Sequence, residues 1–333
     1  MQETLVAQSM ILGMDTKITH RVFGKYTKNA LRAVNNEAIR LEKILSRFIP
    51  ESEISKINKY AGIKYEKLSS DTYELLSLAI QFSNCCQGLF DVTIGPLIDL
   101  WDYKHASQLP GEEKIRQVLP LVNYADLILN PYEKTAGLQK LGQSIDLGSI
   151  AKGYASDKFL EVFQKHGITS AFTNIGGNVS TLGSKPDGSP WCIGIQHPRH
   201  ENQLLGAVSV VNKAVVTSGD YQRYFFDSTG KRYHHILDPT TGYPSESGLI
   251  SVTIVADSAT VADALSTILF ISGVKKGIDI LKNFPDALAI LVDTDMLVYV
   301  TNGLKDCFQA NKDIRAKILD LKGENQNEKK GEK

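Results

Sequence analysis

Apolar residues recur at helical spacing in three long segments of the chain. Residues 28–46, 71–87 and 256–272 each place apolar side chains three or four positions apart, the period of an amphipathic helix. In the second segment Asp71 and Glu74 have the spacing of an N-terminal capping box. We therefore expect three long helices in these segments.

Shorter apolar runs, several of them alternating with polar residues, predict β-strands. The expected strands cover residues 10–24, 168–175, 191–196, 207–216, 249–255, 286–292 and 296–301. Residues 221–226 and 233–237 flank an Asp-Ser-Thr-Gly turn and predict a hairpin. Residues 51–58 are polar and are expected to form a turn, and residues 104–118 a surface insertion.

Helices and strands alternate irregularly, and several strands form hairpins. This order favours an α+β fold, or a mixed α/β fold with substantial antiparallel sheet, over a doubly wound sheet. We expect one large catalytic unit over residues 10–318, built as one lobe or two. Residues 1–9 are expected to be a flexible extension. Residues 319–333 are expected to be a disordered polar tail, because residues 323–333 include no apolar side chain.

The composition excludes several classes of partner. With 42% hydrophobic and 22% charged residues, the 333-residue chain has the composition of a soluble globular protein. Its 37 basic residues balance 37 acidic ones, so no broad basic field favours nucleic acid or an anionic membrane. Apolar runs such as residues 265–272 are too short to cross a bilayer, and we expect no transmembrane segment.

The N-terminus and the cysteines bear on the cellular compartment. Residues 1–5 lack the basic and apolar regions of a signal peptide, so the chain is interpreted as cytoplasmic or as the mature form of an exported protein. The cysteines form no C-x-x-C pair and are expected to be free, mostly buried thiols and not disulfides or zinc ligands. These residues are Cys85, Cys86, Cys192 and Cys307.

The densest group of chemically versatile residues is the loop over residues 233–244, which contains His234, His235 and Asp238. Its prolines and glycine favour a rigid turn, and its sequence fits neither the helical nor the strand period. Paired imidazoles in such a loop can bind a metal, transfer protons or simply hydrogen-bond the loop. The loop alone leaves these three interpretations open.

A second candidate site is the start of the helix that follows Gly148 and ends near His166. A helix N-terminus binds anions through its free N–H groups and its positive dipole end, and Lys152 adds a charge in the first turn. The spacing is neither a Walker A loop nor a G-x-G-x-x-G motif, so an ordinary capped helix is the alternative. Gly176 and Gly177 at a predicted strand end permit close ligand approach or a tight turn.

Two further pairs of side chains combine a carboxylate with a hydroxyl. Asp263 and Thr267 lie four positions apart and therefore share one side of an otherwise apolar helix. A carboxylate there needs a partner, which is either a hard cation such as Mg²⁺ or an ion pair or cap-like hydrogen bond. Asp91 and Thr93 also point the same way, but a polar edge before a Gly-Pro turn explains them equally well.

In their order along the chain these blocks resemble the ApbE-type family of FAD:protein FMN transferases, from about residue 14 to residue 273. The matching blocks are residues 14–16, 48–58, 88–97 with Trp101, 145–157, 174–178, 217–221, 235–244 and 262–267. This chain departs from the family at two positions. It has Met14-Asp15-Thr16 where Met-Gly-Thr is usual, and Asn178 where an aspartate is common.

The resemblance implies a reaction. Such enzymes cleave the pyrophosphate of FAD, release AMP, and attach FMN by a phosphoester bond to a Thr or Ser of an acceptor redox protein. They require Mg²⁺. The resemblance places FAD in the cleft of the catalytic unit, and it implies three metal ligands, the main-chain carbonyl of Ser149 and the side chains of Asp263 and Thr267.

The resemblance also implies roles for other residues. The implied FAD-binding residues are Met14, Phe90, Asp91, Lys152, Asn178, Ser218 and His235. Lys152 is expected beside the FAD phosphates, and Asp238 is expected to hold the catalytic loop. His235 is expected to deprotonate or orient the acceptor hydroxyl, a task that suits an imidazole at neutral pH. We therefore expect His235, Lys152 and Asp238 to be the catalytic residues.

Family members typically act outside the cytoplasm, often as lipoproteins, so the resemblance implies an extracytoplasmic, membrane-anchored full-length protein; a cytoplasmic one is the alternative. Two other activities fit the same residues. One is an Mg²⁺-dependent FAD pyrophosphatase, in which water replaces the acceptor hydroxyl, and the other is non-catalytic flavin binding. A hydrolase with Ser218 as nucleophile fits poorly, because the chain lacks a G-x-S-x-G elbow there.

Overall fold

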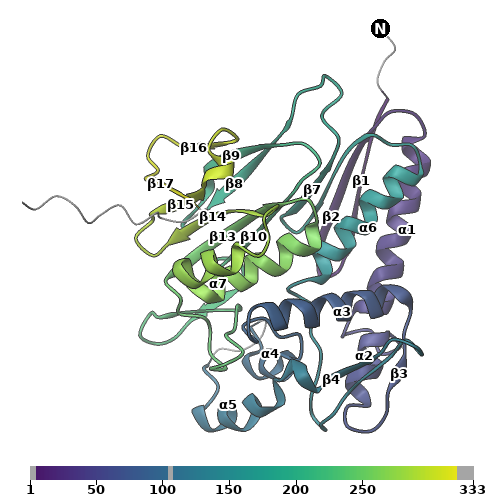
Figure 1. Cartoon of the computed structure of the whole chain (residues 1–333), viewed down its shortest axis with the longest axis vertical. Coiled ribbons are helices and arrows are strands. Elements are labelled where there is room, and N and C mark those ends of the chain that lie inside the picture. Colours follow the sequence, from purple (N-terminus) through teal and green to yellow (C-terminus); the bar gives the residue numbers. More distant parts are fainter. Residues whose placement is uncertain (1–4, 104–107, 321–333) are drawn as a thin grey trace, which may run out of the picture.

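A nine-stranded sheet forms the centre of the protein in the computed structural model, which describes residues 5–103 and 108–320 (Figure 1). All neighbouring strands are antiparallel except β15 and β17, which are parallel. Their order is β1 (Val6–Gly13), β2 (Thr16–Phe23), β6 (Ser170–Ile175), β7 (Asn178–Leu182), β10 (Ala214–Gly219), β13 (Leu249–Ala256), β14 (Leu288–Asp293), β15 (Val298–Thr301) and β17 (Ala316–Leu319). This arrangement confirms the mixed α/β fold with a largely antiparallel sheet.

Three long helices cover one face of this sheet (Figure 1). They are α1 (Thr27–Leu45), α6 (Ala151–Lys165) and α7 (Ala259–Leu281). The apolar stripe predicted for α1 is buried, with Val34 and Leu41 inaccessible to solvent. Helix α7 extends beyond the predicted end at residue 272. The chain bends at Gly273, where φ is 72°, and then resumes the helix as far as Leu281. Burial of apolar surface between these helices and the sheet is the main stabilising contribution.

A small second sheet covers part of the opposite face. It contains β8 (Trp191–His197), β9 (His200–Val210) and β16 (Phe308–Ala310), and its apolar side chains meet those of β10, β13, β14 and β15 in a separate cluster. Trp191 and Val208 belong to this cluster. The sequence predicted one strand over residues 207–216, but a turn at Asn212, with φ 53°, separates β9 from β10. The chain therefore crosses from one sheet to the other at this turn.

The remaining elements form a smaller lobe beneath the helical layer (Figure 1). Its helices are α2 (Glu53–Lys59), α3 (Ser70–Cys85), α4 (Gly95–Trp101), α5 (Glu112–Val118), η1 (Leu119–Leu121) and η2 (Tyr124–Asp126). Its strands are β3 (Glu66–Lys67), β4 (Leu127–Asn130) and β5 (Thr135–Leu138). The hairpin of β11 (Tyr224–Phe226) and β12 (Arg232–His234) was predicted and is present, and η3 (Asn302–Leu304) follows β15.

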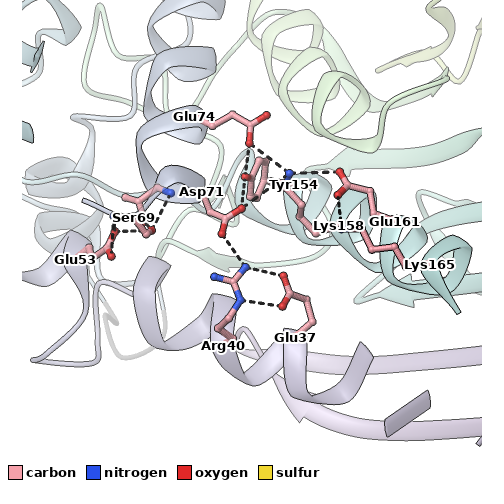
Figure 2. Close-up of polar contacts among 11 residues, drawn as sticks. Glu37, Arg40, Glu53, Ser69, Asp71, Glu74, Tyr154, Lys158, Glu161 and Lys165 are labelled. Carbon is pink, nitrogen blue, oxygen red and sulfur yellow. Dashed lines mark hydrogen bonds and ion pairs between the residues drawn. The ribbon is translucent and has the colours of Figure 1, made fainter. Parts of the chain in front are cut away.

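A network of charged side chains ties α1, α3 and α6 together, as Figure 2 shows. Arg40 of α1 donates to Asp71 of α3 at 2.8 Å. The hydroxyl of Tyr154 in α6 lies 2.9 Å from the Asp71 carboxylate and 2.7 Å from that of Glu74, and Lys158 lies 3.3 Å from Glu74. Because Tyr154 follows Lys152 by two residues, this network holds the first turn of α6 against the smaller lobe.

Several local predictions were wrong. Residues 10–24 do not form one strand, since β1 and β2 make a hairpin whose two turn residues, Met14 and Asp15, have φ of 52° and 58°. Such turns usually contain Asn-Gly, so the sequence carried no turn signal. Residues 51–58 contain helix α2, whose cap is Ser52. The cap of α3 is Ser69 and not Asp71, which instead accepts from Arg40 and Tyr154.

Other predictions concerned the chain ends and the cysteines. Residues 6–9, expected within a flexible extension, form half of β1, whereas residues 1–4 and 321–333 lie outside the described residues. The cysteines are free thiols, but only Cys86 is buried, so the expectation of mostly buried thiols was wrong. Within the described residues no helix is long and apolar enough to span a bilayer.

His20 on β2 gives the fold a distinctive response to acid. Its ring is buried against Phe159 and Phe163, and both ring nitrogens have no hydrogen-bond partner in the described structure. Burial lowers the pKa of His20 to about 4. Between the unfolded pKa near 6.5 and this value only the unfolded chain binds the proton, so stability falls as the pH drops through this window.

A His20→Leu variant is expected to lose this acid sensitivity. From pH 7 to pH 4 the wild-type free energy of unfolding should lose about 3 kcal/mol through His20, whereas the variant should not. Chemical denaturation of both proteins across this pH range measures the difference. Parallel stability curves for the two proteins would show that His20 does not cause the acid sensitivity.

Candidate active site

Six segments that are distant in sequence converge at one end of the main sheet. They are the β1–β2 turn, the start of α6, the start of β7, the end of β10, the first half of α7, and the loop after β12. The packing brings together most of the residues that the sequence singled out. Lys152, Asn178, Ser218, His235, Asp263 and Thr267 belong to this group.

The carboxylate of Asp263 lies at the centre of the site and is 3% exposed. One oxygen accepts a hydrogen bond from the Asn178 side-chain amide at 3.0 Å, and the other accepts from the Gly153 backbone N–H at 2.8 Å. In the described part of the chain no lysine, arginine or histidine forms an ion pair with it. A buried carboxylate held by two neutral donors has no positive partner, and a bound cation would supply one.

The hydrogen bond from Gly153 also releases a backbone carbonyl. In a regular helix the N–H of Gly153 would bond to the carbonyl of Ser149, four residues earlier. Here that N–H bonds to Asp263, and the Ser149 carbonyl accepts no hydrogen bond from any backbone N–H of the described residues. A free carbonyl oxygen beside a buried carboxylate provides two of the oxygen donors that a hard cation requires.

Gly153 is the residue that allows helices α6 and α7 to approach this closely. A Cβ atom at this position would lie 2.3 Å from the Ala259 carbonyl oxygen and 2.7 Å from Cβ of Asp263. No side chain fits there, so glycine is required by the packing. The same close approach brings the Ser149 carbonyl and the Asp263 carboxylate to one place.

Hydroxyl groups form the next side of the site. Thr267 lies one helical turn after Asp263 on α7, and its Oγ1 is 3.4 Å from Oγ of Ser218 on β10. Ser218 also contacts Ser266 at 2.7 Å, and Ser266 donates to the Asp263 carbonyl at 2.8 Å. Ser218 is therefore part of a hydroxyl cluster beside Asp263, and no general base for a nucleophilic serine contacts it in the described structure.

Taken together, the donor set consists of one carbonyl, one carboxylate and one hydroxyl oxygen. Hard cations such as Mg²⁺ prefer such oxygens and complete their coordination with water or substrate phosphate. Among the described residues no group of three or more His, Cys, Asp or Glu side chains could hold a metal ion. A site of the transition-metal kind, rich in imidazole or thiolate, is therefore not built by the described residues, whereas the oxygen donors fit Mg²⁺.

Lys152 lies in the first turn of α6, beside this oxygen cluster. Its Nζ donates to the Gly148 carbonyl at 2.8 Å, and within the described residues it forms no ion pair with a carboxylate. The lysine thus adds its positive charge to a helix N-terminus whose dipole also favours anions. An oxyanion such as a phosphate matches this charge.

His235 lies on the loop after β12, near enough to Lys152 for the lysine charge to lower its pKa, and is half-buried. Its backbone N–H donates to the Arg223 carbonyl at 3.0 Å, and its Nδ1 lies 3.2 Å from the same oxygen. A carbonyl only accepts, so Nδ1 carries the proton and the Nε2 lone pair is left available. Burial, reinforced by the charges of Arg223 and Lys152, lowers the pKa of His235 to about 3, so the ring is neutral at pH 7.

The neighbouring His234 has a different environment. It is buried, its Nε2 lies 3.0 Å from the Ser245 carbonyl, and its ring packs edge-on against Phe270. Burial lowers the pKa of His234 as well. The structure therefore separates the two histidines, with His234 in the core of the loop and His235 facing the site.

Asp238 holds the rest of this loop together. Its carboxylate accepts from the backbone N–H and the hydroxyl of Thr240 at 2.8 Å and 2.6 Å, and its own N–H donates to the Tyr243 carbonyl. The indole of Trp101 donates to the Gly242 carbonyl at 2.9 Å, which fixes the loop on α4. The geometry gives Asp238 a loop-holding role and shows no contact between it and His235.

Two other predicted FAD-binding residues, Phe90 and Asp91, contact structural partners. The side chain of Phe90 is 2% exposed in the core against Phe82. Asp91 is buried, accepts from Thr93 and from the Tyr124 N–H, and has a pKa that burial raises. Both side chains are buried, and their contacts fix the chain segment that precedes α4.

Met14 lies in the β1–β2 turn, where its N–H donates to Glu42 at 2.8 Å. The adjacent Asp15, which replaces the usual glycine, accepts from Arg223 at 2.9 Å. Because the Arg223 carbonyl in turn holds His235, this ion pair connects the turn to the catalytic loop. Sequence reasoning missed Arg223 and Gly153, since neither lies in a motif whose spacing indicates its partner.

A free carbonyl, a buried carboxylate, a lysine at a helix N-terminus and a neutral imidazole form a site whose chemistry suits a phosphate group. The chain belongs to the ApbE family, whose sequence profile matches residues 14–292. It is 37% identical to the FAD:protein FMN transferase of Klebsiella pneumoniae over 76% of this chain and 78% of that protein. It is 31% identical to the FAD:protein FMN transferase of Treponema pallidum over 91% and 86%.

Solved structures show the same relationship. The crystal structure of the ApbE protein from Thermotoga maritima superposes with a TM-score of 0.83 at 31% identity, covering 90% of this chain and 98% of that one. The apo flavinyl transferase ApbE of Pseudomonas stutzeri gives a TM-score of 0.77 at 30% identity, covering 87% and 92%.

Proposed function

We propose that this protein is an Mg²⁺-dependent FAD:protein FMN transferase. In the proposed reaction the hydroxyl oxygen of an acceptor Thr or Ser bonds to the FMN phosphorus, the pyrophosphate P–O bond breaks, AMP leaves with the bridging oxygen, and the hydroxyl proton passes to Nε2 of His235. The observation that carries the proposal is the junction of α6 and α7, where Gly153 gives its N–H to Asp263 and so frees the Ser149 carbonyl. The membership of the ApbE family supports the assignment.

In this proposal Ser149, Asp263 and Thr267 hold the cation. Mg²⁺ supplies neutralisation of charge that develops on the phosphate oxygens. Asn178 orients the Asp263 carboxylate by its 3.0 Å hydrogen bond. Ser218 supports Thr267 through the hydroxyl cluster.

Lys152 and His235 act on the substrates. Lys152 and the N-terminus of α6 bind the FAD phosphates, which positions the pyrophosphate for attack. The free Nε2 of His235 accepts the hydrogen bond of the acceptor hydroxyl and orients its oxygen toward phosphorus. A bound dianionic substrate raises the proton affinity of this nitrogen, which makes it a stronger base in the complex than in the free protein.

The acceptor is proposed to be a redox protein with an accessible Thr or Ser, and the full-length protein is proposed to work outside the cytoplasm as a membrane-anchored lipoprotein.

The reaction is tested by incubating the protein with FAD and Mg²⁺, with and without an acceptor domain. Transfer gives AMP and covalently bound flavin, whereas an FAD pyrophosphatase gives AMP and free FMN in both samples. Binding of FAD without AMP release would contradict both enzymatic functions.

An Asn178→Asp variant is expected to depend more strongly on Mg²⁺ than the wild type. The substitution replaces the amide donor of Asp263 with a second carboxylate, and two buried like charges repel. In a chelator the variant should lose about 2 kcal/mol of stability, and Mg²⁺ should restore it. Thermal unfolding with chelator and with Mg²⁺ measures this response, and equal Mg²⁺-induced shifts in both proteins would contradict it.

A further inference from the structure

Strand β1 is an unprotected edge of the main sheet. It is the first strand in the sheet order, and within the described residues no strand pairs with its outer side. Its eight residues, Val-Ala-Gln-Ser-Met-Ile-Leu-Gly, include neither a charged residue nor a proline. Natural proteins usually block such edges with charges, prolines or bulges, because a free edge pairs readily with another extended chain.

The hydrogen-bonding groups of the free edge follow from the strand register. The Gly24 N–H donates to the Leu5 carbonyl, and alternation from this pair directs the odd-numbered residues of β1 toward β2. The N–H and C=O groups of Val6, Gln8, Met10 and Leu12 therefore point outward. The next one in the series, the N–H of Met14, is already bonded to Glu42.

The side chains beside this edge are also suited to a partner. Met10 is 61% exposed and Leu12 is 85% exposed, both on the face of the sheet opposite α1. A hollow of about 440 Å³ on the same face is lined by Met10 together with Lys17 and Arg21 of β2. The hollow thus combines apolar surface with two positive charges, so it suits an extended segment that carries apolar and acidic side chains.

The edge leads directly to the active site. β1 runs from the N-terminal corner toward the middle of the molecule, where it ends at the Met14–Asp15 turn (Figure 1). Asp15 pairs with Arg223, whose carbonyl holds His235. A chain that pairs with β1 is therefore delivered to the residues that orient the acceptor hydroxyl.

We propose that the acceptor polypeptide binds as an added β-strand along the β1 edge, and that this pairing carries its Thr or Ser to His235. The inference rests on the proposed FMN transfer. Recognition through backbone hydrogen bonds tolerates different acceptor sequences, while the hollow beside Met10 selects among their side chains. A second copy of this chain is the less suitable occupant. It would bring another Lys17 and Arg21 to the same interface, where like charges repel.

The test compares Met10→Pro with Met10→Ala. Proline removes one outward N–H from an edge position, where it is tolerated, whereas alanine keeps that N–H and removes the same side chain. The acceptor probe is a peptide of about ten residues with one central Thr, chosen from a varied set because the wild-type protein labels it with FMN. We expect Met10→Pro to lower kcat/KM for this peptide roughly ten-fold relative to Met10→Ala. The affinity for FAD and the rate of AMP release without acceptor should stay the same in both variants.

Equal peptide labelling by the two variants would overturn the β1 proposal, as would a wild-type dimer that Met10→Pro separates without loss of labelling. Failure of the wild-type protein to label any acceptor would instead contradict the FMN transfer itself. Should Met10→Pro not fold, hydrogen exchange of the wild-type protein decides. Saturating peptide must slow exchange at Val6, Gln8, Met10 and Leu12, and unchanged exchange at these amides would also overturn the proposal.

Discussion

An Asp263→Asn variant is expected to lose FMN transfer by about a thousand-fold, because it removes the only carboxylate in the proposed cation site. The amide keeps the shape of the side chain, but its NH₂ group would face either the Asn178 amide or the Gly153 N–H, both of which are donors. The Mg²⁺-induced increase in Tm should disappear with the activity.

Asp257→Asn is the matched control. This carboxylate lies just before the same helix and pairs with Lys213 at the surface, far more exposed than Asp263. It should leave the FMN transfer rate and the Mg²⁺-induced shift in Tm unchanged. Wild-type transfer or an unchanged Mg²⁺ response in Asp263→Asn would show that the cation does not bind at this carboxylate.

A His235→Gln variant is expected to lower kcat for FMN transfer about a hundred-fold while the KM for FAD changes little. Glutamine retains a polar side chain but cannot take up the proton of the acceptor hydroxyl. Because burial and nearby charge lower the pKa of His235 to about 3, the free enzyme holds this imidazole neutral throughout the range near neutrality. His235 should therefore cause no acid limb near pH 6.5 in the kcat/KM profile for FAD. In this pH range the wild-type and His235→Gln profiles should have the same shape.

The control for this variant is His234→Gln. His234 contacts the Ser245 carbonyl and Phe270 inside the loop, so its substitution should lower Tm more than it lowers kcat. Stopped or reduced transfer in His234→Gln with normal transfer in His235→Gln would reverse the assignment of the two histidines.

Local patterns predicted the long elements well. The apolar stripe of α1 and the apolar run of β13 depend on side chains close in sequence, and the structure buries both. The hairpin at Met14 and Asp15 could not be predicted in this way. Both residues adopt a left-handed conformation that their side chains do not favour, and the surrounding sheet stabilises it.

The candidate site was only partly predictable for a similar reason. The i, i+4 spacing indicated that Asp263 and Thr267 share a helix face, but it gave no information on what lies opposite. The Gly153 hydrogen bond to Asp263 and the ion pair between Asp15 and Arg223 join residues separated by 110 and 208 positions. Such contacts depend on how the helices and hairpins pack, and no local pattern contains that information.

The central claim is that the junction of α6 and α7 supports transfer of FMN from FAD to a protein hydroxyl. The most direct measurement is the ratio of AMP released to flavin bound covalently to the acceptor, determined by intact-mass spectrometry with FAD, Mg²⁺ and acceptor, in wild type and Asp263→Asn side by side. We predict equal amounts of AMP and bound FMN for the wild type and almost none of either for the variant. AMP without bound FMN in the wild type, or equal labelling by the variant, would contradict the claim.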